Sequence, residues 1–237
     1  MDAAPPYPGI VRAIVDLVFS PTRLFTALRE KPRILVPLLA LGIGTGVLSL
    51  SVVSGPMLND IRGQFEQSEM SDEQREAILE KMGGSWGRVT AIVPALTTPI
   101  LALAIAAVFA IGLAVARSLS PGPAVPFRSL LSLSAHIGLL DVLEFLLKLP
   151  LMFAKGTLKV YTSLALILPE DAADTRLFTF LNSFDLFTLW KLGLYSLGLA
   201  IVASRGRRET AVVVALFWVV FVLAKTALHG VVSLGPG

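Results

Sequence analysis

Long apolar runs separated by short polar segments are the feature that most constrains how this chain can fold. Residues 34–53 contain no charged side chain, and the whole sequence is 54% hydrophobic but only 16% charged. Soluble proteins carry roughly a quarter charged residues, whereas a helix that crosses a bilayer needs about 20 apolar residues. The sequence therefore predicts an all-α, polytopic membrane helix bundle.

The apolar runs predict about five transmembrane helices in a single bundle. The expected spans are residues 34–53, 91–116, 129–153, 184–203 and 211–228. Between the first two spans, residues 55–88 are polar and acidic and are expected to form a helical loop outside the membrane. Within this loop, Ser71 and Gln74 fit a capping box, and Gly83-Gly84 should end the helix that the box begins. Residues 161–168 are too short to cross and are expected at the membrane interface.

The N-terminal region, residues 1–33, is expected to be a Pro-rich tail followed by two short interfacial helices, and residues 34–237 are expected to form the transmembrane domain. Apolar residues recur at helical spacing in both short helices, beginning with Ile10 and Ile14 in the first and with Leu24 and Leu28 in the second. Ser20 is expected to cap the second helix. Both helices should lie at headgroup level, with their apolar faces in lipid or against the bundle.

Small residues on the first two spans favour close helix packing. Gly42 and Gly46 form a GxxxG pair in the first span. A ladder of alanines at i, i+4 spacing follows in the second span, at Ala102, Ala106, Ala110 and Ala114. These surfaces could pack within one chain or between two copies. Prolines 94 and 99 are expected to kink the second span.

The positive-inside rule predicts the orientation, because Lys and Arg near the ends of spans favour the cytoplasmic side. With the N-terminus inside, the inner segments hold Arg12, Arg23, Arg29, Lys31, Arg33, Arg117, Arg128, Arg205, Arg207 and Arg208. The longer outer segments hold fewer, namely Arg62, Arg75, Lys81, Arg88, Lys155, Lys159 and Arg176. The rule therefore predicts a cytoplasmic N-terminus and an outside C-terminus, in the inner cell membrane if the source is bacterial.

Ionisable residues inside the predicted spans form a candidate intramembrane polar cluster. They are Asp141, Glu144, Lys148, Asp185, Lys191 and Lys225. A charge in hydrocarbon costs about 2.5 to 3.5 kcal/mol on insertion scales unless it is paired or faces water. Three acidic and three basic groups could neutralise one another, with Glu144, Lys191 and Lys225 at similar depth. The cluster is either a structural ion-pair network, or the pathway of a small ion or solute transporter or channel, or a site for a polar substrate or lipid headgroup. Asp185 could also be stabilised by the positive N-terminal end of its own helix dipole, with Asn182 and Ser183 before it as the helix caps.

Few catalytic motifs are present. The chain has no cysteine and two histidines, and no Walker A, zinc or nucleic-acid motif. Residues 83–87 match the letters G-x-S-x-G of a nucleophile elbow, so a remote alternative is an intramembrane serine protease that uses Ser85 and His229. A nucleophile elbow needs a strand before it, which the sequence lacks, and His136 fits a hydrogen-bonded bundle residue. We therefore expect no enzyme, no cofactor, no metal site and no nucleic-acid partner.

Two motifs resemble the Yip-type membrane proteins, a family named for interaction with Ypt/Rab GTPases. One is Ser20-Pro21-Thr22-Arg23-Leu24-Phe25, with Pro32 and Pro37-Leu38 after it, and the other is Phe184-Asp185-Leu186-Phe187-Thr188-Leu189-Trp190, with Gly193 and Gly198. The resemblance implies a five-helix fold with a cytosolic N-terminus and a role in organising membranes or protein partners. Eukaryotic relatives carry a long cytosolic N-terminal region, which this chain lacks, so it looks more like the compact prokaryotic members. The expected partners are the bilayer and either another membrane protein or a second copy.

Overall fold

The computed structural model describes residues 9–66, 71–119, 125–169, 172–173 and 175–229. The predicted Pro-rich tail lies outside the described residues except for Gly9. In chain order the elements are α1 (Ile10–Phe19), α2 (Pro21–Glu30), α3 (Leu35–Val52), the π turn η1 (Val53–Met57), α4 (Leu58–Glu66), α5 (Asp72–Gly83), α6 (Ser85–Leu119), α7 (Phe127–Lys155), the 3-10 turn η2 (Leu164–Ile167), α8 (Arg176–Leu181), α9 (Leu186–Val202) and α10 (Arg207–Ala227). The predicted all-α class is confirmed.

Five long helices, α3, α6, α7, α9 and α10, form the bundle and correspond to the predicted spans. Among the described residues, α3, α6 and α10 are long and apolar enough to cross a membrane, and α9 is a shorter apolar helix. With a rise of about 1.5 Å per residue, the 17 residues of α9 extend for about 26 Å, close to the thickness of a bilayer core. Helix α7 is longer, at 29 residues, but carries charged residues. The bundle is therefore that of a membrane protein.

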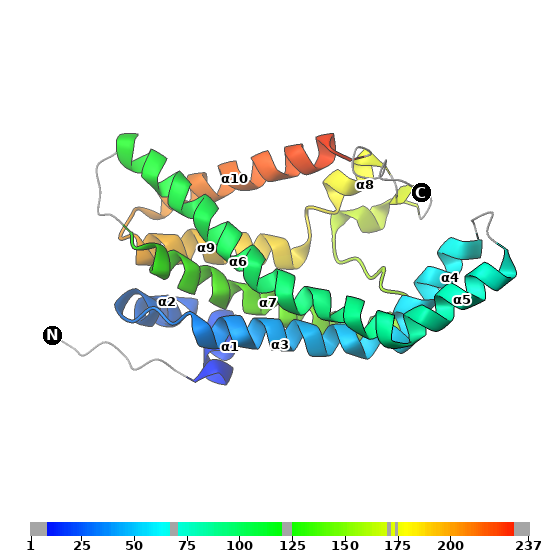
Figure 1. The fold of residues 1–237 in the computed structure, drawn as a ribbon. Coiled ribbons are helices and arrows are strands. Elements are labelled where there is room, and N and C mark those ends of the chain that lie inside the picture. Colours follow the sequence, from blue (N-terminus) through cyan, green and yellow to red (C-terminus); the bar gives the residue numbers. More distant parts are fainter. Residues whose placement is uncertain (1–8, 67–70, 120–124, 170–171, 174, 230–237) are drawn as a thin grey trace.

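The connections gather at two ends of the bundle (Figure 1). Helices α1 and α2 and the α9–α10 connection lie at one end, which we call the inner end, following the predicted topology. Helices α4, α5 and α8 lie at the other end, called the outer end. The structure thus groups the polar connections as the predicted topology requires.

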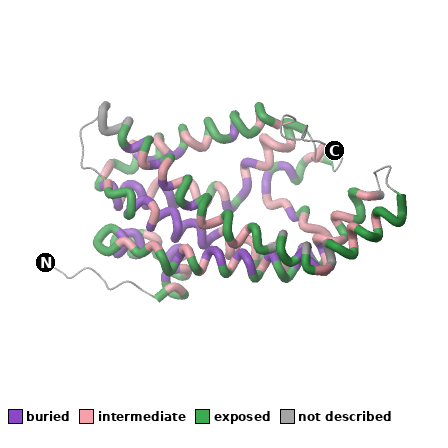
Figure 2. Tube along the Cα trace, viewed as in Figure 1, coloured by how far each residue is buried: buried purple, intermediate pink, exposed green. Residues whose placement is uncertain are grey.

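The tightly packed core lies toward the inner end (Figure 2). It joins Leu17 of α1 and Phe25 of α2 to Leu41, Leu133 and Leu199 of the long helices, all of which are buried. Many apolar side chains of the long helices remain exposed instead, for example Leu96 and Val220. Such a surface is unusual for a soluble protein but suits contact with lipid. The short N-terminal helices therefore pack one face against the bundle, which is one of the two arrangements expected for them.

The GxxxG surface of α3 packs within the chain. A Cβ atom on Gly42 would lie 2.8 Å from the carbonyl oxygen of Ala95, and one on Gly46 would lie 2.9 Å from the Ala95 Cβ. Ala102 and Ala106 of α6 are buried as well, whereas Ala114 is exposed. The first half of the alanine ladder therefore serves the same bundle as the glycines, as expected for small residues that let helix backbones approach closely.

The helical loop follows the predicted local signals. The Gln74 amide donates to Ser71 Oγ at 3.3 Å, and the Ser71 amide donates to Gln74 Oε1 at 3.2 Å, which forms the predicted capping box. Helix α5 ends at Gly83, with Gly84 as its C-cap. The ends of the neighbouring spans differ from prediction, because α3 continues through η1 into α4 and α6 already begins at Ser85. Proline 56 lies inside η1, where the wider turn accommodates it.

Two further sequence expectations were wrong in detail. Ser20 occupies the N-cap position of α2 but its side chain makes no cap hydrogen bond, because its backbone conformation is not the extended one typical of a cap. Helix α10 begins at Arg207 rather than near residue 211, so the basic residues of the last connection belong largely to its first turn. Both prolines of α6 lie inside one continuous helix.

Candidate functional site

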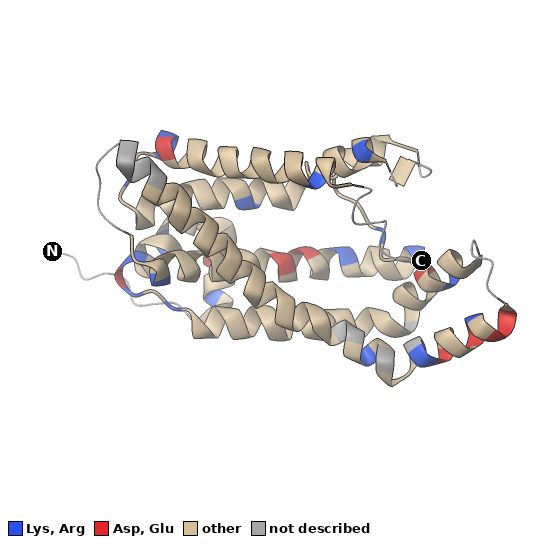
Figure 3. Ribbon diagram, turned by 45° about the horizontal axis from the view of Figure 1, so that its top comes forward, with Lys and Arg blue, Asp and Glu red and all other residues tan. Residues whose placement is uncertain are grey.

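Helices α7 and α9 place charged side chains opposite each other in the outer part of the bundle. On α7, Asp141, Glu144 and Lys148 follow one another at helical spacing and so share one face. Helix α9 contributes Lys191, and Asp185 precedes its first residue. Figure 3 shows that the long helices carry few charged residues along their lengths.

The five side chains form one alternating series of negative and positive groups, which we call the ion chain. Lys191 Nζ lies 2.5 Å from Asp141 Oδ1 and 3.7 Å from Glu144 Oε2. Lys148 Nζ lies 2.5 Å from Glu144 Oε1 and 3.6 Å from Asp185 Oδ2. Each ammonium group therefore bridges two carboxylates, and each pairing compensates part of the cost of placing charge in hydrocarbon.

Exposure decreases along the ion chain toward Asp185. The Asp141 side chain is 35% exposed and that of Lys191 is 22% exposed. The Lys148 side chain is only 12% exposed and lies over the Phe187 ring, with Nζ 5.8 Å from the ring centroid. A cation near the face of an aromatic ring gains a further attraction when it is partly desolvated. The ion chain is therefore most enclosed at Lys148 and Asp185.

Asp185 joins the ion chain to the backbone of α9. Its Oδ1 accepts hydrogen bonds from the amides of Phe187 at 2.8 Å and Thr188 at 3.4 Å, so it is the N-cap of the helix. The expectation that Asn182 and Ser183 cap this helix was wrong, because α9 begins only at Leu186, after the turn that contains them. The ion chain has one more carboxylate than ammonium groups. Asp185 thus places a negative charge at the positive end of the α9 helix dipole.

A segment distant in sequence completes the surroundings of Asp185. The Thr162 hydroxyl donates to Asp185 Oδ2, and the Leu186 amide donates to the Thr162 carbonyl at 3.3 Å. Ser163 Oγ donates to Asn182 Oδ1 at 2.7 Å. The apolar stretch 161–168, expected only at the interface, therefore also closes the outer end of the ion chain. Thr162 was missed because a lone threonine in an apolar stretch carries no pattern that points to a distant aspartate.

Lys225 does not belong to the ion chain, which corrects the sequence expectation. It lies in the last turn of α10, where it is exposed, and no carboxylate of the described residues lies within ion-pair distance of it. Because α10 packs on α9, α8 and α6 rather than on α7, its last turn is not directed at the α7 carboxylates. Three carboxylates and two ammonium groups therefore remain.

A second polar contact at the outer end was also missed by the sequence. Asp60 of α4 accepts hydrogen bonds from Thr157 Oγ1 at 2.5 Å and from the Leu158 amide at 2.8 Å. These residues follow Gly156, whose φ of 68° ends α7 in the left-handed conformation that glycine adopts without strain. The Asp60 contact fixes the end of α7 to the helical loop.

The remaining chemical candidates lie apart from the ion chain. His136 is fully buried on α7, with Nδ1 2.7 Å from the Ser132 carbonyl oxygen, as expected of a bundle residue. Ser85 is an exposed first residue of α6, preceded by a helix rather than a strand. His229 shares a hydrogen bond of 2.9 Å with Thr179. Among the described residues, no three acidic or histidine side chains converge as metal ligands would.

The chain resembles a bacterial membrane protein. Membrane protein YknW of Bacillus subtilis strain 168 is 27% identical to it over 199 residues, which cover 79% of this chain and 77% of that protein. No protein-family model and no solved structure matches the chain. Together with the apolar helices, this similarity supports a membrane protein, but it does not extend to the Yip-type family or to any particular membrane or role.

Proposed function

We propose that the chain is a non-enzymatic, Yip-type, multi-pass membrane protein that organises protein partners or the bilayer. The observation that carries the proposal is the ion chain, in which every charged group is paired within the same protein. A transport pathway needs charged groups that exchange their partners for water or substrate. Groups that are paired with one another, with the one surplus carboxylate held by the α9 amides at Asp185, instead hold α7 and α9 in register.

The packing on the inner side of the ion chain supports the same conclusion. Helix α7 contributes three fully buried residues to the main core, namely Leu133, Ile137 and Leu140. They lie between the ion chain and the inner end. Leu194 and Leu199 of α9 belong to the same core. An ion that left Asp141 toward the inner end would therefore meet a closely packed layer, in which Ser134 and His136 are buried among the apolar side chains. This close packing opposes the transporter alternative.

The two segments that carry the Yip-type resemblance lie on packed elements. Helix α2, which contains most of the first motif, packs against α9, which contains most of the second. Leu24 and Phe25 of the first motif and Phe187 of the second are buried. A shared role in packing accounts for the apolar character of both motifs and supports a common scaffold with the family. We propose a cytoplasmic N-terminus and an outside C-terminus for it.

Reconstituted Glu144→Gln beside wild type tests the proposal. We expect a lower melting temperature for the variant, because both lysines lose part of their partner charge, and no flux of ions through either protein in liposomes. A matched control is Glu76→Gln, which removes a carboxylate from an exposed position of α5. Flux through wild type that changes in Glu144→Gln while the fold stays intact would replace the scaffold by the transporter alternative.

A further inference from the structure

We propose that α1 and α2 form a binding platform for anionic lipid headgroups at the inner end. In this arrangement the outer face of α1 enters the acyl-chain boundary and surrounding arginines and lysines bind lipid phosphates. The inference deepens the proposed function, on which it rests, by naming the surface through which the protein contacts the bilayer. We call the outer face of α1, formed by Val11, Val15 and Phe19, the lipid face.

Helix α1 has two apolar faces, of which the bundle covers one. Ala13 and Leu17 are 0% exposed in the main core, whereas Val11 is 73% and Phe19 is 79% exposed. A short helix that used its apolar residues only for internal packing would present polar side chains on its outer side. The lipid face is therefore left uncovered by the part of the chain that the structure describes.

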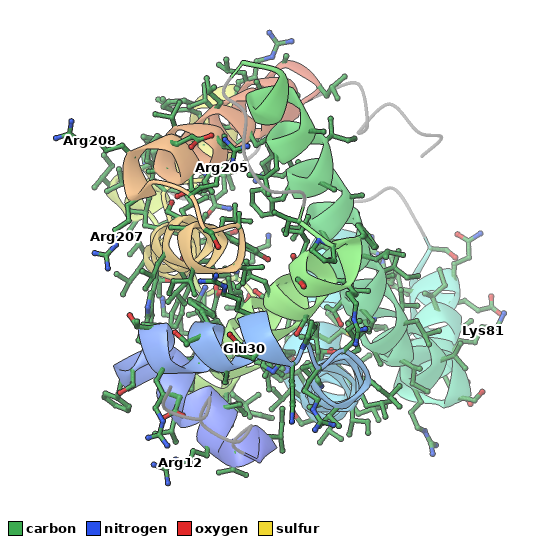
Figure 4. The ribbon with its side chains drawn as sticks, turned by 90° about the vertical axis from the view of Figure 1, so that its left-hand side faces the viewer. Arg12, Glu30, Lys81, Arg205, Arg207 and Arg208 are labelled. Atoms are coloured by element: carbon green, nitrogen blue, oxygen red, sulfur yellow. The ribbon has the colours of Figure 1, made fainter. Side chains whose placement is uncertain are left out.

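The orientation of both helices suits a membrane surface. Figure 4, viewed toward the inner end, shows α3 and α9 end-on while α1 and α2 lie across the view. Their axes thus run across the end of the bundle, which is the plane of the bilayer surface if the long helices cross it. The linker after α2 is held in place, since Ser132 Oγ of α7 donates to the Arg33 carbonyl at 2.7 Å and accepts from the Arg33 amide at 3.0 Å. Amphipathic helices in this orientation bury one face at the headgroup boundary.

The charge of the inner end complements anionic headgroups. Its exposed basic residues are Arg12, Arg23, Arg29, Lys31, Arg33, Arg128, Arg207 and Arg208. Acidic groups at this end offset only part of this charge, because Asp16 is buried 4.0 Å from Arg23, Glu209 pairs with Arg205, and Glu30 is exposed at the end of α2. In Figure 4, Arg12 extends from one side of the bundle and Arg207 and Arg208 from another. Basic groups that extend from more than one side of this end match a layer of headgroups rather than one compact protein partner.

Single-cysteine spin labels test whether the lipid face lies in lipid, and the absence of native cysteine makes this direct. Phe19→Cys is labelled with a nitroxide in vesicles of phosphatidylcholine mixed with phosphatidylglycerol, and Ala77→Cys on exposed α5 is the matched control. We expect relaxation by oxygen to exceed relaxation by a water-soluble nickel complex at position 19 and the reverse at position 77. A position 19 as accessible to nickel as position 77 would overturn the proposal and indicate a protein partner for this face.

Charge removal tests the preference for anionic lipid. We expect Arg12→Gln with Arg29→Gln to lower the association of spin-labelled phosphatidylglycerol, relative to phosphatidylcholine, by about fivefold for each residue replaced. The matched control is Arg62→Gln with Lys81→Gln, which removes equal charge from the exposed outer end. An equal loss in both pairs, or no loss in either, would overturn the headgroup assignment. Neither readout depends on flux, so failure here is distinguishable from failure of the scaffold proposal.

Discussion

The Lys191 ammonium of α9 lies 2.5 Å from the Asp141 carboxylate of α7, two residues that are 50 positions apart in the sequence. The same ammonium is also close to Glu144, so one lysine holds two carboxylates of the neighbouring helix. Both helices thereby gain a fixed register in the outer part of the bundle, where the surrounding apolar side chains are less tightly packed than in the core.

Removing this lysine is expected to destabilise the protein. Lys191→Met leaves Asp141 without its partner and is predicted to lower the free energy of unfolding by about 2 kcal/mol, measured by unfolding in mixed micelles. Adding Asp141→Leu should restore most of the loss, because replacing both partners of an ion pair by apolar groups is often nearly neutral. Lys225→Met, at an exposed lysine outside the ion chain, is the control and should change stability little. Equal losses for Lys191→Met and Lys225→Met would contradict the assigned pairing.

Asp185 has two structural roles that substitution can separate. Asp185→Asn keeps an oxygen that accepts from the Phe187 and Thr188 amides but loses the charge near Lys148. Asp185→Ala loses both, and the missing cap alone should cost about 1 kcal/mol. Hydrogen exchange at the Phe187 and Thr188 amides should therefore accelerate in the alanine variant but change little in the asparagine variant. Similar acceleration in both variants would show that the charge, and not the cap, holds this turn.

The space around two glycines predicts opposite effects of replacing them with alanine, because Gly42 lies where α3 packs closely against α6 and Gly193 does not. Gly42→Ala places a methyl group 2.8 Å from a backbone oxygen and should lower stability by about 1 to 3 kcal/mol. A Cβ atom on Gly193 of α9 would meet nothing within 4 Å, so Gly193→Ala should be neutral or stabilise the helix by about 0.5 to 1 kcal/mol. Melting temperatures of the two variants give the comparison. A harmless Gly42→Ala would show that α3 and α6 lie farther apart.

The orientation in the membrane can be mapped with new cysteines, since the chain has none. Ala77→Cys in α5 should react with an impermeant maleimide added to intact cells, whereas Arg29→Cys in α2 should react only after the membrane is opened. Both positions are exposed, so accessibility of the side chain itself is matched. The reverse labelling pattern would overturn the proposed cytoplasmic N-terminus and leave the fold unaffected.

Ser85 is predicted to be chemically ordinary. It begins α6 directly after the Gly84 helix cap, without the strained strand-to-helix turn that activates a nucleophilic serine. A fluorophosphonate probe should therefore leave the wild-type protein unlabelled under conditions that label a known serine hydrolase. Labelling of wild type that disappears in Ser85→Ala would instead establish the protease alternative.

The sequence was sufficient wherever the signal is local. Long, largely apolar runs determined the long helices, because hydrocarbon admits a backbone only when it satisfies its own hydrogen bonds. The Ser71 capping box and the following glycines determined α5, since every partner in such a motif lies within a few residues. Helical spacing likewise placed Asp141, Glu144 and Lys148 on one face of α7.

Only the tertiary structure decided which distant groups meet. It paired Lys191 with Asp141, brought Thr162 to Asp185, and left Lys225 outside the ion chain. It also gave the Gly42 surface its partner in α6 and revealed a second, uncovered apolar face on α1. Periodicity fixes the face of a helix on which a residue lies, but the rotation and neighbours of that helix depend on packing along the whole chain, which no local pattern contains.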